Sequence, residues 1–284
     1  MLKRLISKLL VASMLASVLF SFSITASAAT LSVWVASSYE NVFKDSLRGS
    51  GSESSINLVV VKNEYESSQI VMRSDSAFTI NGVTFSNLTS GSNTIASSNL
   101  KYNFVEYVYM GENTDGQNSS TTVRWGAGWY PDQLSNNSTV SVPANTTQPV
   151  WVTMYIPKTA AAGTYTGTAT VNTSLGNYTV NITAEVNNVT IPDSKDGNFT
   201  WFAWQQTGGT WGFDSWKDSH PNDNIKIIYG HERWTTQWWS LIADIAQKMK
   251  AGRINSLYIN PHELLVDGGT TLTNGTYNFN LSKF

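Results

Sequence analysis

The chain has 284 residues, of which 41% are hydrophobic and 13% are charged, and its formal net charge at pH 7 is -2. This mildly negative balance argues against nucleic acid or an anionic membrane as the main partner. The chain contains no cysteine, which excludes disulfides, thiolate metal sites and a lipid-modified N-terminal cysteine. A hydrophobic core must therefore stabilise the fold.

The first 28 residues have the pattern of a secretory signal peptide. Three basic residues precede position 9, residues 9–22 are mostly apolar, and residues 26–28 are the Ala-Ser-Ala of a cleavage site. The alternative is a retained membrane anchor, but serines interrupt an apolar stretch that is shorter than the ~20 residues of a spanning helix. We expect cleavage before Ala29, which removes the three positive charges, and an extracellular bacterial protein with no membrane segment.

Residues 29–195 carry the pattern of an antiparallel β-sandwich. Short alternating runs recur at the spacing of such a fold, and glycine, proline, asparagine and serine separate them. The clearest run, 150–156, combines β-branched and aromatic residues. A hairpin is predicted from 164–171 and 178–186. The other predicted strands are 31–36, 56–61, 66–73, 78–85 and 103–109.

An irregular stretch between Gly111 and Asn137 contains Trp125, Trp129, Tyr130 and Pro131. Loops of this length in compact domains are often functional. Exposed Trp and Tyr rings could stack on sugars, because a pyranose face presents C–H bonds to a π surface. The alternative, which we favour, is that these aromatic residues seal the sandwich against its neighbour.

The pattern changes after a short connector at 189–197. Residues 199–204 are apolar throughout, as in a strand buried on both faces. A helical stripe follows over 232–250, Gly252 is its expected C-terminal cap, and 254–261 is a second strand. Strand, helix and strand in this order form a βαβ unit, the opening of a (β/α) barrel.

A complete barrel of this type needs roughly 250 residues, many more than those that follow the sandwich. We therefore predict that residues 196–284 are the incomplete N-terminal part of a truncated (β/α)8 barrel, and that this part is poorly stable by itself because its sheet edges are unpaired. The chain as a whole is predicted to be mainly β, with a signal peptide at 1–28, a β-sandwich at 29–195 and the barrel portion at 196–284.

Four residues of the second domain are candidates for substrate binding. The active site of a barrel lies at the carboxyl ends of its strands. Trp204 ends the first predicted strand, and its ring could form a sugar platform. Asn260, His262 and Glu263 end or follow the second strand. The alternative interpretation is that the segment 260–263 is only a turn that opens a short helix.

Other chemistry is not indicated. The three histidines are far apart and lack the spacing of metal ligands. No nucleophile elbow, phosphate-binding glycine loop or dinucleotide fingerprint is present. We therefore predict no metal site and no cofactor. Nothing in the sequence indicates the oligomeric state.

Several segments resemble a known family in their order and spacing. The sandwich is similar to the N-terminal domain of family 123 glycoside hydrolases and their relatives, and the following domain resembles the first part of that family's catalytic barrel. The segments that carry the resemblance are 33–36, 61–71, 148–158, 160–168, 253–257 and 277–284.

The resemblance implies a β-N-acetylgalactosaminidase-like enzyme that acts by substrate assistance, with a consecutive Asp-Glu pair on a mid-barrel strand. No consecutive Asp-Glu occurs in this sequence, so no catalytic residue can be assigned. The expected function is that of an N-terminal fragment of a secreted glycoside hydrolase for amino-sugar glycans, inactive as this chain. One alternative is a non-catalytic carbohydrate-binding or cell-surface β-sandwich protein. Another is a related family whose barrel is equipped differently.

Overall fold

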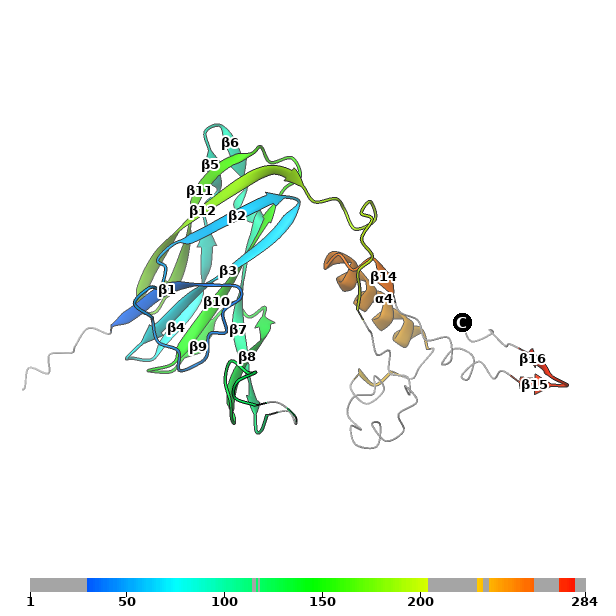
Figure 1. Cartoon of the computed structure of the whole chain (residues 1–284). Helices are drawn as coiled ribbons and strands as arrows, with labels where there is room; N and C mark the ends of the chain where they lie inside the picture. Colours follow the sequence, from blue (N-terminus) through cyan, green and yellow to red (C-terminus); the bar gives the residue numbers. More distant parts are fainter. Residues whose placement is uncertain are drawn as a thin grey trace, which may run out of the picture. The chain divides into compact units, whose positions relative to one another are not determined.

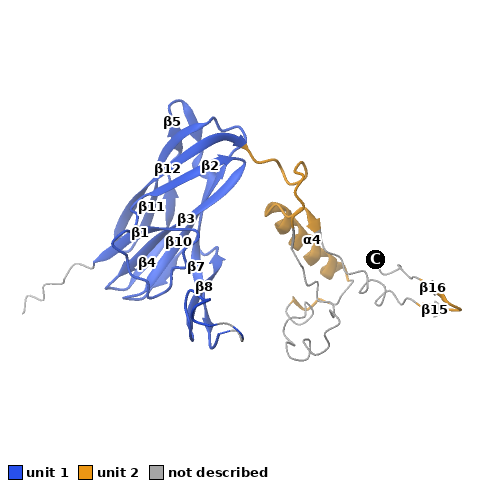
Figure 2. Cartoon of the chain, viewed as in Figure 1, with its two compact units in different colours: residues 1–189 blue, residues 190–284 orange. Residues whose placement is uncertain are grey.

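The computed structural model describes residues 30–113, 116, 118–203, 229–231, 235–257 and 271–278. The predicted signal peptide lies outside these residues. The chain divides into two compact units, residues 1–189 and 190–284, which Figure 2 distinguishes by colour. Each unit is described by itself. None of the helices in the described ranges has the length and apolar character needed to cross a lipid bilayer.

Unit 1 is a β-sandwich of two sheets (Figure 1). Sheet A has five strands and is antiparallel throughout; in spatial order they are β1 (Leu31–Ser37), β3 (Glu64–Ser74), β10 (Thr147–Ile156), β7 (Leu100–Met110) and β8 (Gly128–Ser135). Sheet B has seven strands, namely β2 (Ile56–Lys62), β12 (Gly176–Thr190), β11 (Gly163–Thr173), β4 (Phe78–Phe85), β9 (Val140–Val142), β5 (Leu88–Ser90) and β6 (Asn93–Ile95).

Every strand predicted for the sandwich is present, and the predicted hairpin is formed by β11 and β12. The main difference is β8, which lies in the stretch that was predicted to be irregular. Pro131 is tolerated inside β8 because this strand is the edge of sheet A, where a backbone N–H is not needed on the outer side. Three strands of only three residues each, β5, β6 and β9, were also missed.

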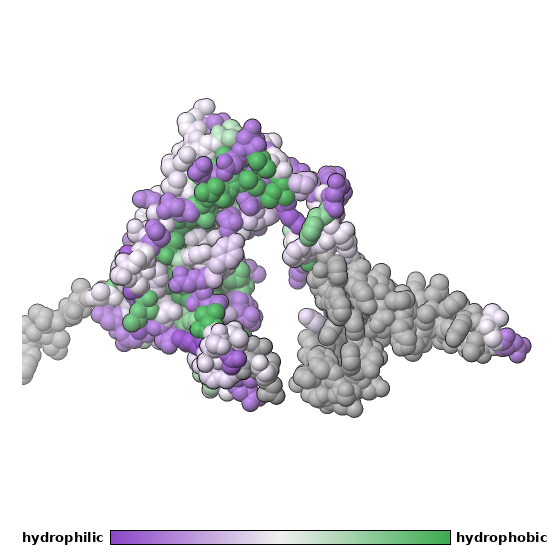
Figure 3. Space-filling view, in the orientation of Figure 1, coloured by the Kyte–Doolittle hydropathy of each residue, from purple (hydrophilic) through white to green (hydrophobic). Residues whose placement is uncertain are grey.

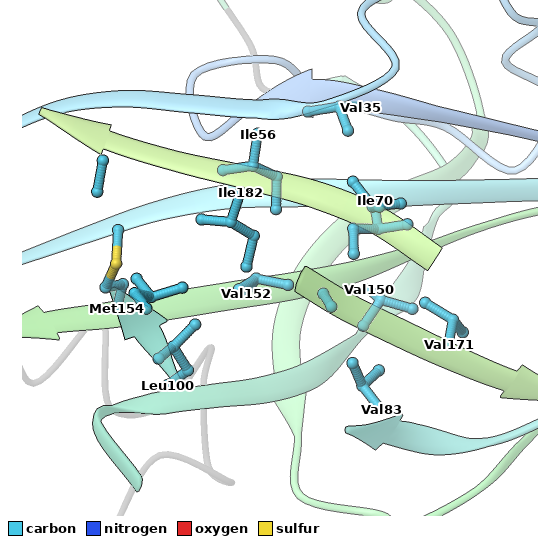
Figure 4. Packing of buried hydrophobic residues seen from close by; sticks show 14 of the residues in the cluster. Val35, Ile56, Ile70, Val83, Leu100, Val150, Val152, Met154, Val171 and Ile182 are labelled. Carbon is cyan, nitrogen blue, oxygen red and sulfur yellow. The ribbon is translucent and has the colours of Figure 1, made fainter. Parts of the chain in front are cut away.

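The core of unit 1 lies between the inner faces of the two sheets. Figure 4 shows side chains from both sheets pointing toward one another, among them Ile70 and Val150 from sheet A and Val171 and Ile182 from sheet B. These four side chains are at most 1% exposed. Burial of such side chains supplies the main favourable free energy of folding, which agrees with a domain that has no disulfides.

A proline interrupts the hydrogen bonding of the central strand β10. Pro149 has no N–H, and the pairing of Val150 with Phe104 places Pro149 opposite Val105 of β7. The buried side chain of Gln148 donates to the Val105 carbonyl instead, over 2.9 Å. The β7–β8 register shifts just beyond, between Val105 and Tyr107. A side chain thus replaces the missing backbone donor.

Unit 2 contains the predicted order of strand, helix and strand. Strand β13 (Phe202–Ala203) pairs in parallel with β14 (Ser256–Leu257), and helix α4 (Thr236–Ala251) lies between them in the chain. The side chain of Asn255 supports the pair, because it accepts from the Trp201 N–H over 2.8 Å and donates to the Phe199 carbonyl over 2.8 Å. That this unit is the incomplete N-terminal part of a truncated (β/α)8 barrel remains a prediction.

Helix α4 begins later than predicted, at Thr236 rather than Glu232. Thr235 has an extended backbone, and its hydroxyl accepts from the Trp238 N–H over 3.3 Å as an N-terminal cap. The predicted cap at Gly252 is confirmed, since its N–H donates to the Lys248 carbonyl over 2.9 Å. Trp238 and Met249 are buried, which confirms that this stripe of the helix packs against other residues.

A hairpin near the end of the described residues was not predicted. Strands β15 (Thr271–Thr273) and β16 (Thr276–Asn278) pair in antiparallel fashion. Asn274 and Gly275 between them both have positive φ angles, 51° and 76°. Asn-Gly favours this turn, because both residues adopt the left-handed region readily.

Candidate functional site

The loop between β1 and β2, residues 38–52, covers part of the outer face of sheet A (Figure 1). Beneath it lies a second buried hydrophobic cluster, formed by Trp34, Ala36 and Val71 of the sheet and Val42 of the loop. Trp34 is 3% exposed although it points away from the main core. The loop is therefore a packed part of the domain.

Side-chain and backbone donors of sheet A bind carbonyl groups of this loop and of the end of β1. Gln69 donates to the carbonyls of Ser37 and Glu40, each over 2.8 Å. The Thr147 N–H donates to the Lys44 carbonyl over 2.8 Å. The Tyr107 hydroxyl donates to the carbonyl of Val42 over 3.0 Å. These bonds pair the buried polar groups and fix residues 42–46 against the sheet.

The outer half of strands β7 and β8 forms a paired ribbon of residues 106–110 and 128–131, in which Tyr109 faces Trp129. The loop contacts this ribbon through aromatic and cationic side chains. The Lys44 Nζ lies 3.8 Å from the ring centroid of Trp129 and 5.2 Å from that of Tyr107. Phe43 packs edge-on against Tyr130 with 5.8 Å between centroids. We call these residues, with Tyr109, Arg124, Asp45 and Arg73, the loop–ribbon cluster.

The loop–ribbon cluster carries more positive than negative charge. Arg124 donates from Nη2 to Oδ1 of Asp45 over 2.6 Å, and its guanidinium lies 3.9 Å from the centroid of the Phe43 ring. Arg73 donates to the Thr147 hydroxyl over 3.2 Å. Arg124 and Arg73 act on the one carboxylate of the cluster, Asp45, and with Lys44 the named cluster residues carry three positive charges and one negative charge.

Two groups of the cluster have shifted pKa values. The hydrogen bond from Arg124 holds the pKa of the Asp45 carboxyl below its ordinary value, against the smaller opposing effect of burial. Burial, followed by the negative charge of Asp45, raises the pKa of the Tyr107 hydroxyl well above its ordinary range. Asp45 is therefore ionised at neutral pH, and Tyr107 remains a neutral donor.

Aromatic rings remain accessible at the surface of the cluster. Tyr109 is 57% exposed and Trp129 is 46% exposed, and their ring centroids are 5.5 Å apart in an edge-to-face arrangement. Trp125, in the connection between β7 and β8, is 50% exposed. Elsewhere on unit 1, Figure 3 shows hydrophobic residues gathering around β2 and β12, which carry the exposed Val59 and Val189.

The described residues of this cluster lack the groups that would hydrolyse a glycoside. A glycosidase requires two suitably placed carboxyl groups, or one with a substrate acetamido group. The carboxylate in the centre of the cluster is Asp45, and its ion pair with Arg124 keeps it deprotonated. Among the described residues, no group of three or more His, Cys, Asp or Glu side chains could hold a metal ion.

The four predicted substrate-binding residues, Trp204, Asn260, His262 and Glu263, lie outside the described residues and stay predictions. The structure does show where the chain leaves the strands that precede them. Ala203 and Leu257 are register partners in the parallel pair β13–β14. The described parts of the two strands therefore end side by side.

Only part of the loop–ribbon cluster could be recognised in the sequence. Trp125, Trp129 and Tyr130 were recognised as unusual aromatic residues, whereas Phe43, Lys44 and the β7 residues Tyr107 and Tyr109 were not. The contacts of Trp129 and Tyr130 with the loop show that these rings pack within unit 1. Whether they also seal the sandwich against a neighbouring domain stays a prediction. The aromatic residues at alternate positions 107 and 109 were the signal from which the β7 part of the cluster could have been predicted.

A family model assigns most of the sandwich. Residues 38–173, which include the loop and the ribbon, match the glycoside hydrolase 123 N-terminal domain. No curated protein matches the chain in sequence.

Among solved structures, a family 123 glycoside hydrolase from Clostridium perfringens, described in connection with glycolipid glycan hydrolysis, aligns with a TM-score of 0.60 and 18% identity. The alignment covers 78% of this chain and 36% of that enzyme, so this chain spans little more than a third of the enzyme's length.

Two further structures align less well. The CooA pilin subunit from enterotoxigenic Escherichia coli has a TM-score of 0.26 and 13% identity, with 55% of this chain and 98% of the pilin covered. BslA, a bacterial hydrophobin, has a TM-score of 0.21 and 14% identity, with 58% of this chain and 98% of BslA covered. The match over residues 38–173 and the alignment with the Clostridium perfringens enzyme confirm that the chain resembles the family 123 glycoside hydrolases, and in particular that its sandwich resembles their N-terminal domain.

Proposed function

We propose that this chain supplies the N-terminal part of a secreted glycoside hydrolase that acts on amino-sugar glycans, and that the chain has no hydrolytic activity by itself. The observation that carries the proposal is the match of residues 38–173 to the glycoside hydrolase 123 N-terminal domain. The absence of a consecutive Asp-Glu pair from the whole sequence supports the proposed lack of hydrolysis. The signal-peptide pattern at residues 1–28 supports secretion.

The alignment with the Clostridium perfringens enzyme supports a catalytic-domain origin for unit 2. Unit 1 ends at Val189 of 284 residues, so an alignment that covers 78% of the chain extends beyond it. The parallel pair β13–β14, with α4 between the strands, is the order expected at the start of a (β/α) barrel. In such a barrel, Trp204 and the segment 260–263 would contribute to the substrate-facing rim.

Two measurements test this proposal. The 284-residue chain is first incubated with nitrophenyl β-N-acetylgalactosaminide, and we expect no release of nitrophenol; release would overturn the proposed inactivity. Calorimetric titration with an N-acetylgalactosamine-terminated oligosaccharide is expected to show weak binding that Trp204→Ala and Glu263→Gln both reduce. The exposed helix residue Asp244 provides the control variant, Asp244→Asn. Absence of binding by the unchanged chain would contradict a role in glycan recognition.

A non-catalytic carbohydrate-binding protein is the second candidate, and the exposed rings of Tyr109 and Trp129 favour it. The two candidates differ in where a neutral amino sugar binds. Loss of this binding in Trp204→Ala and Glu263→Gln favours the glycoside hydrolase part. Loss only after changes in unit 1 favours the binding protein.

A further inference from the structure

The loop–ribbon cluster combines two features that the packing of unit 1 does not require. The first is the accessible pair of rings, Tyr109 and Trp129. The two rings are steeply inclined to each other rather than coplanar, so a pyranose would place its C–H face against the exposed face of one ring and contact the edge of the other. The second feature is the charge beside these rings.

Lys44 lies against one ring of this pair, Trp129, and has no carboxylate partner among the described residues. Its Nζ lies over the Trp129 ring at 3.8 Å, and within the part of the chain that the structure describes no ion pair joins it to an acidic group. The neighbouring carboxylate, Asp45, is already bound by Arg124 over 2.6 Å. A lysine ammonium on a ring face keeps the capacity to donate hydrogen bonds away from the ring.

Hydrogen bonds from sheet A fix the backbone of this lysine. The Lys44 carbonyl accepts from the Thr147 N–H over 2.8 Å and from Arg73 Nη1 over 3.4 Å. Arg73, a residue of β3, places a second positive charge beside the same loop. The region is thus positive on a chain whose formal net charge is -2 and whose charged residues are only 13%.

We propose that the loop–ribbon cluster is a glycan-binding site for an acidic sugar, a pyranose that carries a carboxylate or a sulfate. The sugar ring lies against the exposed parts of Tyr109 and Trp129, and the Lys44 ammonium binds the anionic group. Charge-assisted hydrogen bonds of this kind are stronger than neutral ones. The site consists of residues of unit 1 alone. It rests on the proposed function only for the choice of carbohydrate as the ligand class.

Calorimetric titration of the full chain tests the site with four probes: N-acetylgalactosamine 6-sulfate, glucuronic acid, neutral N-acetylgalactosamine and inorganic sulfate. We expect both acidic sugars to bind at least about tenfold more tightly than the neutral sugar and than sulfate alone, a difference of one charge-assisted contact. Equal binding of the neutral and acidic sugars would overturn the role of the charge. Binding of inorganic sulfate as tight as that of the sulfated sugar would overturn the role of the rings.

Variants locate the site and separate it from the proposed function. Lys44→Met keeps the aliphatic stem and is expected to remove the preference for acidic sugars. Tyr109→Ala removes an exposed ring without a change at Lys44, and is expected to weaken both acidic sugars about tenfold. Lys101→Met, an exposed lysine at the opposite end of β7, is the matched control and is expected to leave binding unchanged.

The variants that lose acidic-sugar binding show which of the two proposals holds. If Lys44→Met and Tyr109→Ala leave acidic-sugar binding intact while Glu263→Gln removes it, the site in unit 1 is refuted and the proposed function survives. If the unit 1 variants lose acidic-sugar binding and no neutral amino sugar binds anywhere, the site is supported and the proposed function fails.

Discussion

The two outer faces of the sandwich differ sharply, although their sheets share one core. On sheet B, outward residues of β11 and β12 pair in register as small polar side chains, for example Thr166 with Thr183 and Thr170 with Thr179. The hydroxyls of Thr170 and Thr179 are 3.0 Å apart, and the pair faces solvent. On sheet A, the outward side chains of Trp34 and Val71 are buried beneath the loop 38–52.

The two faces differ because their strands have different residue patterns. Strict alternation of apolar and threonine residues marks a sheet with one solvated face. Apolar residues on both sides of β1 and β3 instead require a cover, and the loop that provides it carries Phe43 and Lys44 to the ribbon. The covered face is therefore the face that bears the candidate site.

The largest expected loss of stability is at Trp34 on the outer face of sheet A, and Thr170 on the outer face of sheet B provides the comparison. Trp34→Ala removes a large buried side chain and is expected to lower the free energy of unfolding by about 3–5 kcal/mol. Thr170→Ala on the opposite face is expected to change it by no more than about 0.5 kcal/mol. Urea unfolding followed by circular dichroism measures both. Similar losses for the two variants would contradict the view that only the face of sheet A contains a second core.

The second largest loss of stability is expected at Gly167 in sheet B, where neighbouring atoms leave no room for a side chain. A Cβ on Gly167 would lie 2.4 Å from Cδ2 of buried Leu88 and 2.8 Å from the Asn87 carbonyl oxygen. Gly167→Ala is therefore expected to destabilise unit 1 by about 1–3 kcal/mol through overpacking. Gly128→Ala is the control, because its nearest neighbour would be 3.9 Å away. Unchanged thermal stability of Gly167→Ala would show that the β4–β5 corner is free to move.

The hydrogen bond between Tyr107 and the loop should have a smaller effect. Tyr107→Phe leaves the Val42 carbonyl without this donor and is expected to lower the free energy of unfolding by about 1 kcal/mol. The same change is expected to speed proteolysis within residues 38–52. Tyr109→Phe removes an exposed hydroxyl and serves as the comparison. Equal proteolysis rates would mean that the buried apolar cluster alone holds the loop.

The smallest expected effect concerns the Asp45–Arg124 pair. Because the folded-state pKa of Asp45 is below the unfolded value, its stabilising contribution is present above about pH 4 and is lost as the pH falls through the folded-state pKa. The Asp45 side chain is 69% exposed and that of Arg124 is 30% exposed, so solvent screening limits the contribution to about 0–1 kcal/mol. Asp45→Asn is expected to flatten the pH dependence of unfolding in this acidic window. A wild-type slope retained in the variant would assign the effect to other carboxyl groups.

The sequence predicted an element correctly where the pattern of apolar residues within the segment was enough to define it. Strand β4 was predicted with its observed bounds, because Phe78, Ile80 and Val83 mark one buried side. Strand β8 was missed because Gly128 and Pro131 weaken the local signal, and only pairing with β7 makes this segment a strand. The start of α4 depended on the Thr235 cap, which apolar periodicity does not reveal.

The candidate site was less predictable, because its parts are distant in the chain. Trp129 and Tyr130 could be recognised as unusual aromatic residues in a long connection. Lys44 and Phe43 could not, since they are far from the ribbon in sequence and reach it only when the loop packs on sheet A. The predicted residues of unit 2 lie outside the described residues, so they remain to be tested by the titrations above.

The side-chain donor at Gln148 also has a consequence for strand alignment during folding. A β10 strand displaced by one residue would bring Pro149 opposite a different carbonyl of β7, and the amide of Gln148 would point to the other side of the sheet. That carbonyl would remain an unpaired acceptor, which costs about 1–3 kcal/mol when buried. The proline and the glutamine together therefore discriminate against slipped pairings of the central strand. A family member without the proline would have no need of the glutamine.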